Sequence, residues 1–298
     1  MNISGIDITI ERRSVSIGRL SAEKFDFLAE PEVALADLRR AKVPIDLFTF
    51  LQHPRDTRAR YCHPMELDNL AALPVLTYDA WWSKHIDNKT RNMVRRSEKR
   101  GVEVREVPFD ERLVDGIWKI YNECPVRQGR RFSHYGKGVE TVKKEAATFL
   151  DRSVFIGAFH DTQLIGFIKM TSDRDRTLAS IMNIIAMIQQ RDKAPVNALI
   201  AQAVRSCAER QLSQLIYSNF AYGQKRPDSL AEFKRNNGFR RLDVPRYYVP
   251  FTRIGSIAFT LGLHKRLVDH VPELILTRVR ELRNAWYHRF LSQKCNCG

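Results

Sequence analysis

The chain has 298 residues, which is enough for one or two domains. Hydrophobic residues make up 44% of it and charged residues 28%, as in a globular protein, and no stretch reaches the roughly 18–20 continuous apolar residues of a membrane-spanning helix. Forty-nine lysines and arginines against 34 acidic residues give a formal net charge of +15. This charge favours an anionic partner, such as nucleic acid, a phosphorylated cofactor, an acidic carrier protein or a membrane surface. A basic surface that only keeps the protein in solution is the alternative.

The cysteines and the first residues indicate an intracellular protein. The five cysteines are odd in number and scattered, which is typical of reduced thiols rather than of a disulfide framework. The opening stretch MNISGIDITIERR lacks the apolar run of a signal peptide. Cys295 and Cys297 cannot by themselves complete a tetrahedral metal site. We therefore expect a cytoplasmic protein without a bound metal.

Residues 1–77 are predicted to form an N-terminal accessory region. Residues 7–17 (DITIERRSVSI) alternate between apolar and polar side chains like a strand, and residues 32–41 (EVALADLRRA) have helical spacing. A proline recurs every ten residues from Pro44 to Pro74, which disfavours long regular elements in the rest of this region.

The following segment is predicted to contain a basic helix, a strand and an amphipathic helix. The basic helix covers residues 79–100 and would end at Gly101, and the strand covers residues 102–107. Residues 110–124 have helical spacing. The apolar face of this helix consists of Leu113, Ile117, Ile120 and Tyr121.

Three consecutive strands are predicted next. A polar, glycine-containing segment (125–138) and a helix (139–151) precede strands over residues 153–159, 163–173 and 177–188. Links of hairpin length join these strands, so we expect them to form a meander.

The remaining elements alternate between helix and strand. A polar loop over residues 190–197 leads into an Ala-rich helix. A strand over residues 213–220, a helix over 228–238 and a strand over 239–249 follow. Residues 253–298 are predicted to form a basic, amphipathic helical tail.

This order resembles that of the GNAT acyltransferase superfamily. From residue 102 to residue 250 the elements run β-α-α-β-β-β-α-β-α-β, a meander followed by a βαβ unit rather than a Rossmann alternation. The resemblance implies an α+β fold with a mixed sheet flanked by helices. It divides the chain into the accessory region (1–77), which would be the remnant of a second GNAT-like module, a transferase domain (78–252) and the tail (253–298).

Two stretches narrow the resemblance to the Fem-like branch, the relatives of the Fem-type peptidyltransferases. KTRNMVRRSEKRGVEV, residues 89–104, is similar to the basic helix and strand of those proteins. LAEFKRNNGF, residues 230–239, is similar to their FK helix near the end of a GNAT module. In that comparison the basic helix lies beside the substrate, and Lys234 matches a lysine implicated in phosphate recognition. The resemblance implies transfer of an activated acyl or aminoacyl group to an amine.

The polar loop is predicted to be the donor site. A passage from strand through loop to helix can direct free backbone N–H groups at a phosphate, and the resemblance places the cofactor loop here. Ordinary GNAT enzymes have glycines in this loop, whereas this chain has none, so basic side chains would take their place. An ordinary polar turn is the alternative. The predicted cofactor-binding residues are Gln190, Arg191, Lys193, Val196 and Asn197.

Two basic segments and one helix are predicted to bind a substrate. Arg91, Arg95 and Lys99 repeat every four residues and so share one helical face, which could contact phosphates or be simply solvated. The polar segment 125–138 exceeds the usual length of a connection, and long polar loops often carry function. The third segment is the helix over residues 228–238, in which Lys234 could bind a phosphate or could be an exposed lysine without a role. The predicted substrate-binding residues are Arg91, Asn92, Arg95, Arg127, Gln128, Arg131, Tyr135 and Lys234.

Three residues are candidates for catalysis. Asn183 interrupts an apolar strand that in GNAT enzymes faces the reacting carbonyl, although it could equally be hydrogen-bonded beside a bulge. His134 would act as a general base near neutral pH, unless it is structural or merely exposed. Tyr222 could donate a proton; ordinary GNAT enzymes often have such a tyrosine at the position of Lys234.

The sequence therefore predicts an N-acyl- or aminoacyl-transferase. Backbone N–H groups of the strand 181–190 would stabilise the oxyanion, and positioning of two substrates would supply much of the rate. Acyl-CoA, aminoacyl-tRNA and an acidic acyl-carrier protein all remain open as the donor, with an amine as acceptor and no metal. The alternative is a non-catalytic module that binds nucleic acid or an anionic membrane, with the basic tail as a peripheral membrane contact and no transmembrane segment.

Overall fold

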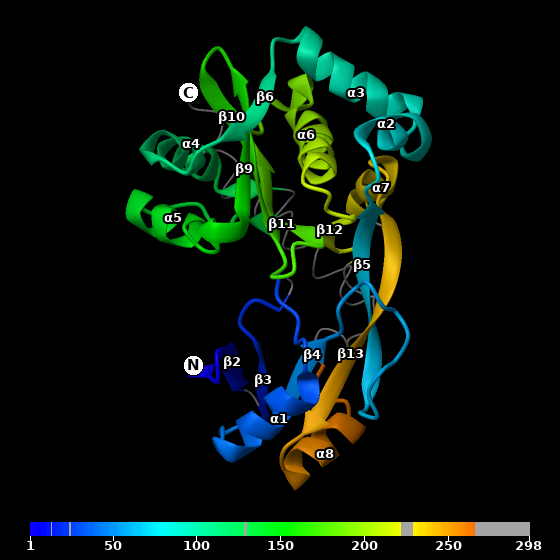
Figure 1. The fold of residues 1–298 in the computed structure, drawn as a ribbon. Helices are drawn as coiled ribbons and strands as arrows, with labels where there is room; N and C mark the ends of the chain where they lie inside the picture. The colour runs from blue at the N-terminus through cyan, green and yellow to red at the C-terminus, as the bar shows by residue number, and fades with distance from the viewer. Residues whose placement is uncertain (13, 24, 128–129, 222–228, 266–298) are drawn as a thin grey trace, which may run out of the picture. The chain divides into compact units, whose positions relative to one another are not determined.

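The computed structural model describes residues 1–12, 14–23, 25–127, 130–221 and 229–265, which form two compact units (Figure 1). The described parts of the first unit are residues 1–72, 216–221, 229–232 and 240–265, and those of the second are residues 73–127, 130–215 and 233–239. The division predicted at residues 77 and 252 concerns family modules and stays a prediction.

The first unit is a mixed sheet with two helices. Its strands follow the order β1-β2-β3-β4-β13-β5, in which β3 and β4 are parallel and the other neighbours are antiparallel. The elements are β1 (Asn2–Ile3), β2 (Ile6–Arg12), β3 (Ser16–Leu20), α1 (Pro31–Arg40), β4 (Leu47–Leu51), β5 (Met65–Pro74), β13 (Arg240–Pro250) and α8 (Arg253–Thr260).

Strand β5 shows that the expectation of no long element among the prolines is wrong. The strand has ten residues. Pro64 lies just before it and Pro74 is its last residue, so neither proline removes an N–H group from the interior of the ladder. The strand predicted over residues 7–17 is two strands, β2 and β3, which pair with each other.

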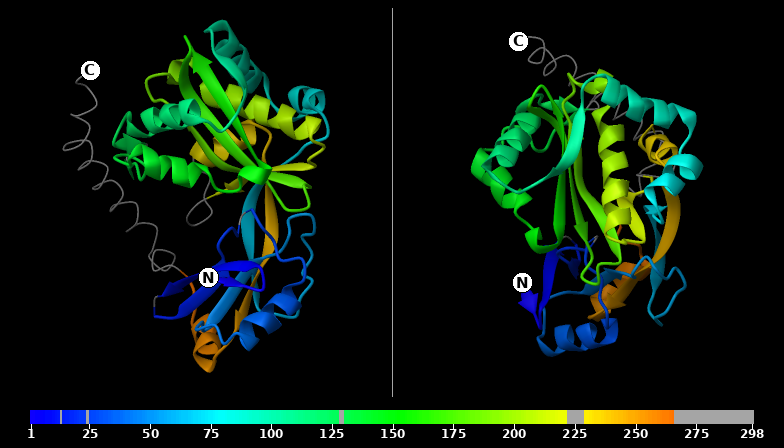
Figure 2. Two further views of the ribbon diagram at one scale, coloured as in Figure 1. Left: turned by 60° about the vertical axis from the view of Figure 1, so that its left-hand side comes forward. Right: turned by 45° about the horizontal axis from the view of Figure 1, so that its top comes forward.

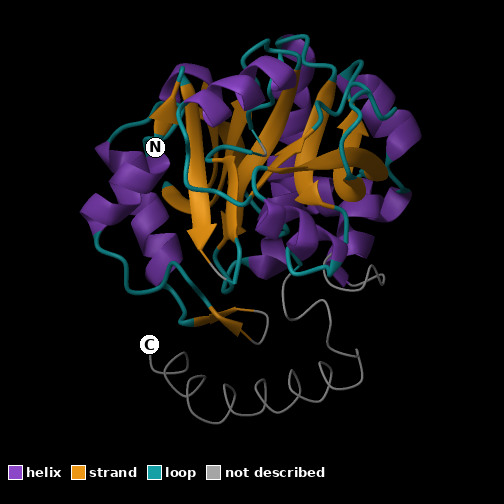
Figure 3. Ribbon diagram, turned by 90° about the horizontal axis from the view of Figure 1, so that it is seen from below, coloured by secondary structure: helices purple, strands orange, loops and turns teal. Residues whose placement is uncertain are grey.

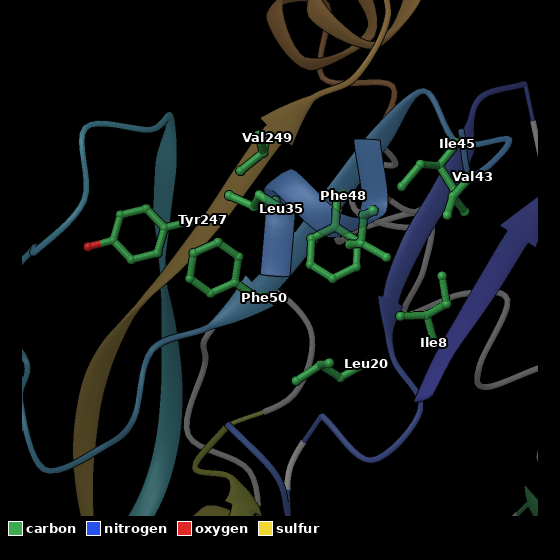
Figure 4. Packing of buried hydrophobic residues seen from close by; sticks show 10 residues of the cluster. Ile8, Leu20, Leu35, Val43, Ile45, Phe48, Phe50, Tyr247 and Val249 are labelled. Carbon is green, nitrogen blue, oxygen red and sulfur yellow. The ribbon is translucent and has the colours of Figure 1, made fainter. Parts of the chain in front are cut away.

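The core of the first unit combines aliphatic side chains with three aromatic rings, those of Phe48, Phe50 and Tyr247 (Figure 4). Phe50 of β4 and Tyr247 of β13 are fully buried and stack with their ring centroids 5.2 Å apart. The Tyr247 hydroxyl donates to Gln52 Oε1 at 3.0 Å and accepts from the backbone N–H of Arg60 at 2.8 Å. The buried phenol is therefore satisfied, and it fixes the segment between β4 and β5.

The second unit is an antiparallel sheet between helices, with the strand order β11-β10-β9-β6. Helices α4 and α5 lie on one face of this sheet and α6 on the other (Figure 1), as the two turned views of Figure 2 also show. The elements are α2 (Tyr78–Ala80), α3 (Asn88–Lys99), β6 (Glu103–Val107), α4 (Glu111–Asn122), β7 (Val126–Arg127), β8 (Arg130–Arg131), α5 (Val139–Ala146), β9 (Ser153–His160), β10 (Gln163–Ser172), β11 (Leu178–Ala186) and α6 (Pro195–Glu209). Residues of β12 (Gln214–Asn219) and α7 (Ser229–Asn236) are divided between the two units.

The predicted element order is confirmed. β6, α4, α5, β9, β10, β11, α6, β12, α7 and β13 follow one another as expected, and the α+β mixture is evident when the ribbon is coloured by secondary structure (Figure 3). The short pair β7–β8 is an addition, because it forms within the segment predicted to be an irregular polar loop. All four residues of the predicted apolar face of α4 are buried. Among the described residues, no helix is both long and apolar enough to cross a membrane.

The helix predicted over residues 79–100 is interrupted near its start. α2 continues into a π-helical turn, Trp81–His85, after which the chain becomes extended. Asp87 then starts α3, because its carboxylate accepts the backbone N–H of Thr90 at 2.7 Å. Gly101 ends α3 as predicted, with a φ of +76° that glycine adopts without strain.

Two of the cysteines differ in exposure. Cys62 and Cys207 are free thiols, the first exposed and the second buried. Burial raises the pKa of the Cys207 thiol to about 12, so this residue is an inert part of the core.

Candidate functional site

Strand β11 changes from buried to half-buried along its length. Leu178 to Ile181 are buried, whereas Met182 to Ala186 are partly accessible. A β-bulge marks the change, because Lys169 of β10 pairs with Asn183 while the next pair joins β10 to Ile181. The predicted catalytic Asn183 therefore lies at the bulge. Its side chain is half-buried and has no hydrogen-bond partner among the described residues, so its carboxamide is available to a ligand.

The loop between β11 and α6 uses most of its own backbone N–H groups. A 3₁₀ turn, Arg191–Lys193, occupies its middle, and Pro195 begins α6 without an N–H group. Five N–H groups donate to carbonyl oxygens of the loop at 3.0–3.4 Å, those of Gln190, Arg191, Lys193, Ala194 and Asn197. Ala194 adopts a left-handed conformation with a φ of +52°, which a glycine would adopt without strain.

The two N–H groups at the start of this loop bond to a carboxylate from another element. Glu123, which follows α4, accepts the N–H of Ile188 on Oε2 at 2.8 Å and that of Gln189 on Oε1 at 2.9 Å. Within the described residues 187–197, Asp192 and Val196 are thus the positions whose N–H groups make no recorded hydrogen bond. The loop as it stands does not present a row of free N–H groups to a phosphate.

Arg127 completes this arrangement. Its Nη1 donates to the carbonyl oxygen of Ala186 at 2.7 Å, and its Nη2 donates to that of Ile120 at 2.6 Å and lies 3.1 Å from Glu123 Oε2. The Glu123 and Arg127 side chains are only 9% and 13% exposed. Burial lowers the pKa of the guanidinium, although Glu123 opposes the shift. We call this pair, with its bonds to Ala186, Ile188 and Gln189, the Glu123–Arg127 clamp.

The predicted basic helix divides into structural and exposed residues. Arg91 donates to the carbonyl oxygens of Trp82 and Ile86 at 2.7 and 2.8 Å, so it fixes the turn before α3. Arg95 is exposed and lies over the Trp82 ring, with Cζ 5.6 Å from the centroid, and Asn92 is also exposed.

The exposed cations of α3 continue onto the loop. Helix α3 packs against α6, and Arg100 Nη1 lies 3.5 Å from Asp192 Oδ2 in the 3₁₀ turn. The basic surface, as we use the term, is the set of accessible cations on these two segments, Arg95, Arg96, Lys99, Arg100, Arg191 and Lys193.

His134 lies in a group of aromatic rings beside Lys137. Its ring centroid is 4.3 Å from that of Tyr121 and 5.3 Å from that of Phe132, and Lys137 Nζ lies 3.2 Å from its Nδ1. Burial and the Lys137 charge lower the pKa of the imidazole. Because an ammonium group has no lone pair, Nδ1 must accept, and the neutral ring then carries its proton on Nε2. In this arrangement His134 would donate a hydrogen bond, and it could act as a base only after Lys137 moved.

The other predicted site residues have varied surroundings. Arg131 and Tyr135 are exposed, and Gln128 and Tyr222 lie outside the described residues. The Asn197 side chain donates to Asn237 Oδ1 at 3.3 Å and so links α6 to the segment after α7, while Val196 is half-buried. Lys234 is fully buried, so the alternative of an exposed lysine is wrong, and its role in substrate binding stays a prediction.

Two residues that sequence reasoning missed have clear roles in the structure. Glu123 could have been noticed from its spacing, four residues before Arg127 at a helix end. Lys169 is the single charge in the apolar run of β10, and its side chain is 1% exposed. Its ammonium donates to the carbonyl oxygen of Ala146 at 2.9 Å and to both oxygens of Thr148, and burial lowers its pKa to about 8.

Metal chemistry finds no support in the described part of the chain, where no group of three or more His, Cys, Asp or Glu residues could hold an ion. No protein-family profile matches the sequence, and no curated protein does so.

Several solved structures do match. The C-terminal domain of a putative lysylphosphatidylglycerol synthetase from Agrobacterium fabrum aligns with a TM-score of 0.56 and 12% identity, over 85% of this chain and 83% of that chain. L-PGS from Bacillus licheniformis aligns with a TM-score of 0.57 and 13% identity, over 85% and 84%. FemX aligns with a TM-score of 0.55 and 10% identity, over 85% of each chain.

The fold is the GNAT fold. These neighbours are GNAT-fold proteins, and the presence of FemX among them confirms the resemblance to the Fem-like branch at the level of the fold. Strands β9, β10 and β11 are the meander predicted from the sequence. The predicted donor loop is the segment that leads from β11 into α6.

Proposed function

We propose that this GNAT-fold chain is an aminoacyl- or acyltransferase that transfers its group beside the half-buried end of β11. The observation that carries the proposal is the combination of the fold with an accessible, unpartnered Asn183 carboxamide at the bulge. Asn183 would donate a hydrogen bond to the reacting carbonyl of the donor, where charge develops during attack by the acceptor. Placement of donor and acceptor along the same strand would supply the rest of the acceleration.

Among the possible donors, the surroundings of the loop favour aminoacyl-tRNA over acyl-CoA. A diphosphate bound in the ordinary way needs free backbone N–H groups, and in this loop most of them are already used. The basic surface offers six accessible cations, which suits a long phosphate backbone better than a single cofactor. An acidic acyl-carrier protein is a weaker alternative. It would bind to the same cations of the basic surface, but it has no chain of phosphates to extend along them.

The acceptor would be an amine, as the Fem-like resemblance implies. The name of one neighbour, a putative lysylphosphatidylglycerol synthetase, adds phosphatidylglycerol as a second acceptor to be tested. His134 would contribute a hydrogen bond from Nε2 to the acceptor side of the reaction, or a proton-accepting nitrogen once Lys137 has moved.

The test is a transfer assay with labelled donors. Total tRNA charged with labelled amino acids, and a set of labelled acyl-CoAs, are each incubated with the protein and with either a peptide amine or phosphatidylglycerol vesicles. We expect product from charged tRNA, and a loss of roughly 100-fold on Asn183→Ala, the size found when one oxyanion donor is removed. Asn2→Ala, which removes an exposed carboxamide from the first unit, should leave the rate unchanged.

Two outcomes would contradict the proposal. Product from acyl-CoA at rates above those with charged tRNA would reverse the choice of donor. Salt-sensitive binding of tRNA without turnover of any donor would favour the alternative of a non-catalytic nucleic-acid binding module.

A further inference from the structure

The Glu123 carboxylate holds the loop in the way that an anionic ligand would. Each carboxylate oxygen accepts one of two consecutive backbone N–H groups, at 2.8 and 2.9 Å, at the point where strand β11 passes into the loop. Paired N–H groups that converge on two oxygens are how protein backbones bind phosphate and other oxyanions. The protein therefore supplies its own anion at a position that a GNAT donor loop would offer to a diphosphate.

Arg127 holds the Glu123 carboxylate in this position. Arg127 pairs with Glu123 and also bonds to the carbonyl oxygen of Ala186, so one side chain of each sign is fixed to the backbone on either side of Met187. A bound diphosphate would have to displace a carboxylate from a buried ion pair and would then face its negative charge. Arg191 lies close enough to lower the pKa of Arg127, so without Glu123 two cationic side chains would lie near this part of the loop.

We propose that Glu123 determines donor specificity, by filling the N–H pair of Ile188 and Gln189 and so excluding donors that carry a diphosphate, such as CoA. The inference rests on the proposed function, because it explains why a GNAT-fold transferase would not bind CoA in this loop and would bind its donor through the basic surface instead. Glu123 touches no substrate in this role; it acts by occupying a site. Removing its charge should convert the start of the loop into an anion site formed by two N–H groups and Arg127.

The first measurement is amide hydrogen exchange at Ile188 and Gln189 in the full chain. In Glu123→Ala both amides should exchange roughly 10- to 100-fold faster, the factor expected for loss of a hydrogen bond to a charged group. In Glu123→Gln, the side-chain amide nitrogen cannot accept, so one of the two amides should stay protected. Glu111→Gln, which removes an exposed carboxylate from the first turn of the same helix α4, is the matched control and should change neither rate.

The second measurement is a titration with CoA, and separately with inorganic pyrophosphate, followed by calorimetry. The wild-type protein and Glu111→Gln should show no saturable binding, whereas Glu123→Ala should bind both probes saturably over the same range of concentrations. Saturable binding of CoA to the wild type would overturn the proposal. Faster amide exchange without any gain of binding would also overturn it, because Glu123 would then be only a structural cap of the loop.

These readouts separate the inference from the proposed function. Amide exchange and binding of CoA require neither turnover nor tRNA, so the clamp can be tested in a protein that shows no transfer. If Glu123→Ala gains CoA binding while charged tRNA gives no product, the specificity role of the clamp stands and the proposed donor fails. If Glu123→Ala folds poorly, the exchange pattern and CoA titration of Glu123→Gln decide the question instead.

Discussion

Two half-buried arginines, Arg246 in the first unit and Arg127 in the second, have opposite pKa shifts. Arg246 of the first unit pairs with two carboxylates, Glu23 and Asp68, the latter at 2.7 Å. Burial alone would lower the pKa of Arg246, but the two carboxylates outweigh it and the pKa is raised. Arg127 of the second unit has one carboxylate partner, and its pKa is lowered.

The two arginines also differ in what they contact. Arg246 belongs to β13 and donates to Asp68 of β5, and both of its charged partners belong to the same unit. Arg127 bonds to the backbone where β11 ends, and its Nε is buried without a partner among the described residues. A buried donor left unsatisfied costs stability, so the native protein keeps this one despite the cost. Such a cost is characteristic of functional sites.

The largest expected effect is on Arg246. Arg246→Met removes the guanidinium that pairs with both Glu23 and Asp68, whose side chains are only partly exposed, so unfolding should require about 3 kcal/mol less free energy. Urea denaturation of both proteins measures the difference. Arg241→Met, which removes an exposed arginine from the same strand, is the control and should cost under about 0.5 kcal/mol. An Arg246→Met variant as stable as the control would show that the two carboxylates do not depend on the arginine.

The corresponding change in the second unit should be smaller. In Arg127→Met the Glu123 carboxylate keeps both of its backbone N–H partners, so we expect a loss of about 1.5–3 kcal/mol. Lys119→Met, on the exposed side of α4, is the matched control for loss of a cation. If Arg127→Met proved as destabilising as Arg246→Met, the contrast between the two arginines would be wrong and Arg127 would be a purely structural residue.

Lys169 extends the comparison to a buried cation with only neutral acceptors. Its pKa of about 8 in the folded protein lies below the ordinary lysine value of 10.5, so the folded state releases the proton first as the pH rises. The cost of the buried charge is fully present below pH 8 and is relieved between pH 8 and about 10.5. Wild type should therefore gain roughly 1–3 kcal/mol relative to Lys169→Met over this range, measured by denaturation at a series of pH values. A difference that is constant with pH would mean that Lys169 stays charged throughout.

The sequence was sufficient for the architecture because local patterns decide it. Alternating and helical periodicities located β9, β10, β11 and α6 in the right order, and Gly101 marked the end of α3 correctly. The π-helical turn before α3 was invisible, since Trp81–His85 have ordinary helical composition and the interruption involves buried contacts of Trp81, whose indole donates to the carbonyl oxygen of Asn237 at 3.0 Å.

The site was harder to predict because its decisive contacts are distant in sequence. Nothing near Ile188 indicates that Glu123, 65 residues earlier, accepts its N–H group. The absence of glycines from the loop is visible in the sequence, but by itself it indicates only a different way of binding a phosphate. The structure adds that the N–H groups are already used, which only the folded loop could reveal. Arg127 was singled out for its charge, and its contact with the carbonyl oxygen of Ala186 depends equally on tertiary structure.

The smallest expected effect is a change in the pKa of His134, the candidate catalytic histidine, when a nearby cation is replaced. Burial, Lys137 and, to a lesser extent, Arg127 all lower the pKa of His134, while Glu145 opposes them. Replacing either cation by methionine should therefore raise the pKa, and Lys137→Met should raise it more, because that ammonium lies 3.2 Å from Nδ1. We expect shifts of a few tenths of a pH unit for Arg127→Met and up to about one unit for Lys137→Met, the ordinary spread of histidine values in folded proteins. An NMR titration of the imidazole measures both shifts, and it also reports which ring nitrogen carries the proton. A proton on Nδ1 would show that Lys137 does not occupy that nitrogen in solution, leaving Nε2 free to accept a proton from the acceptor amine.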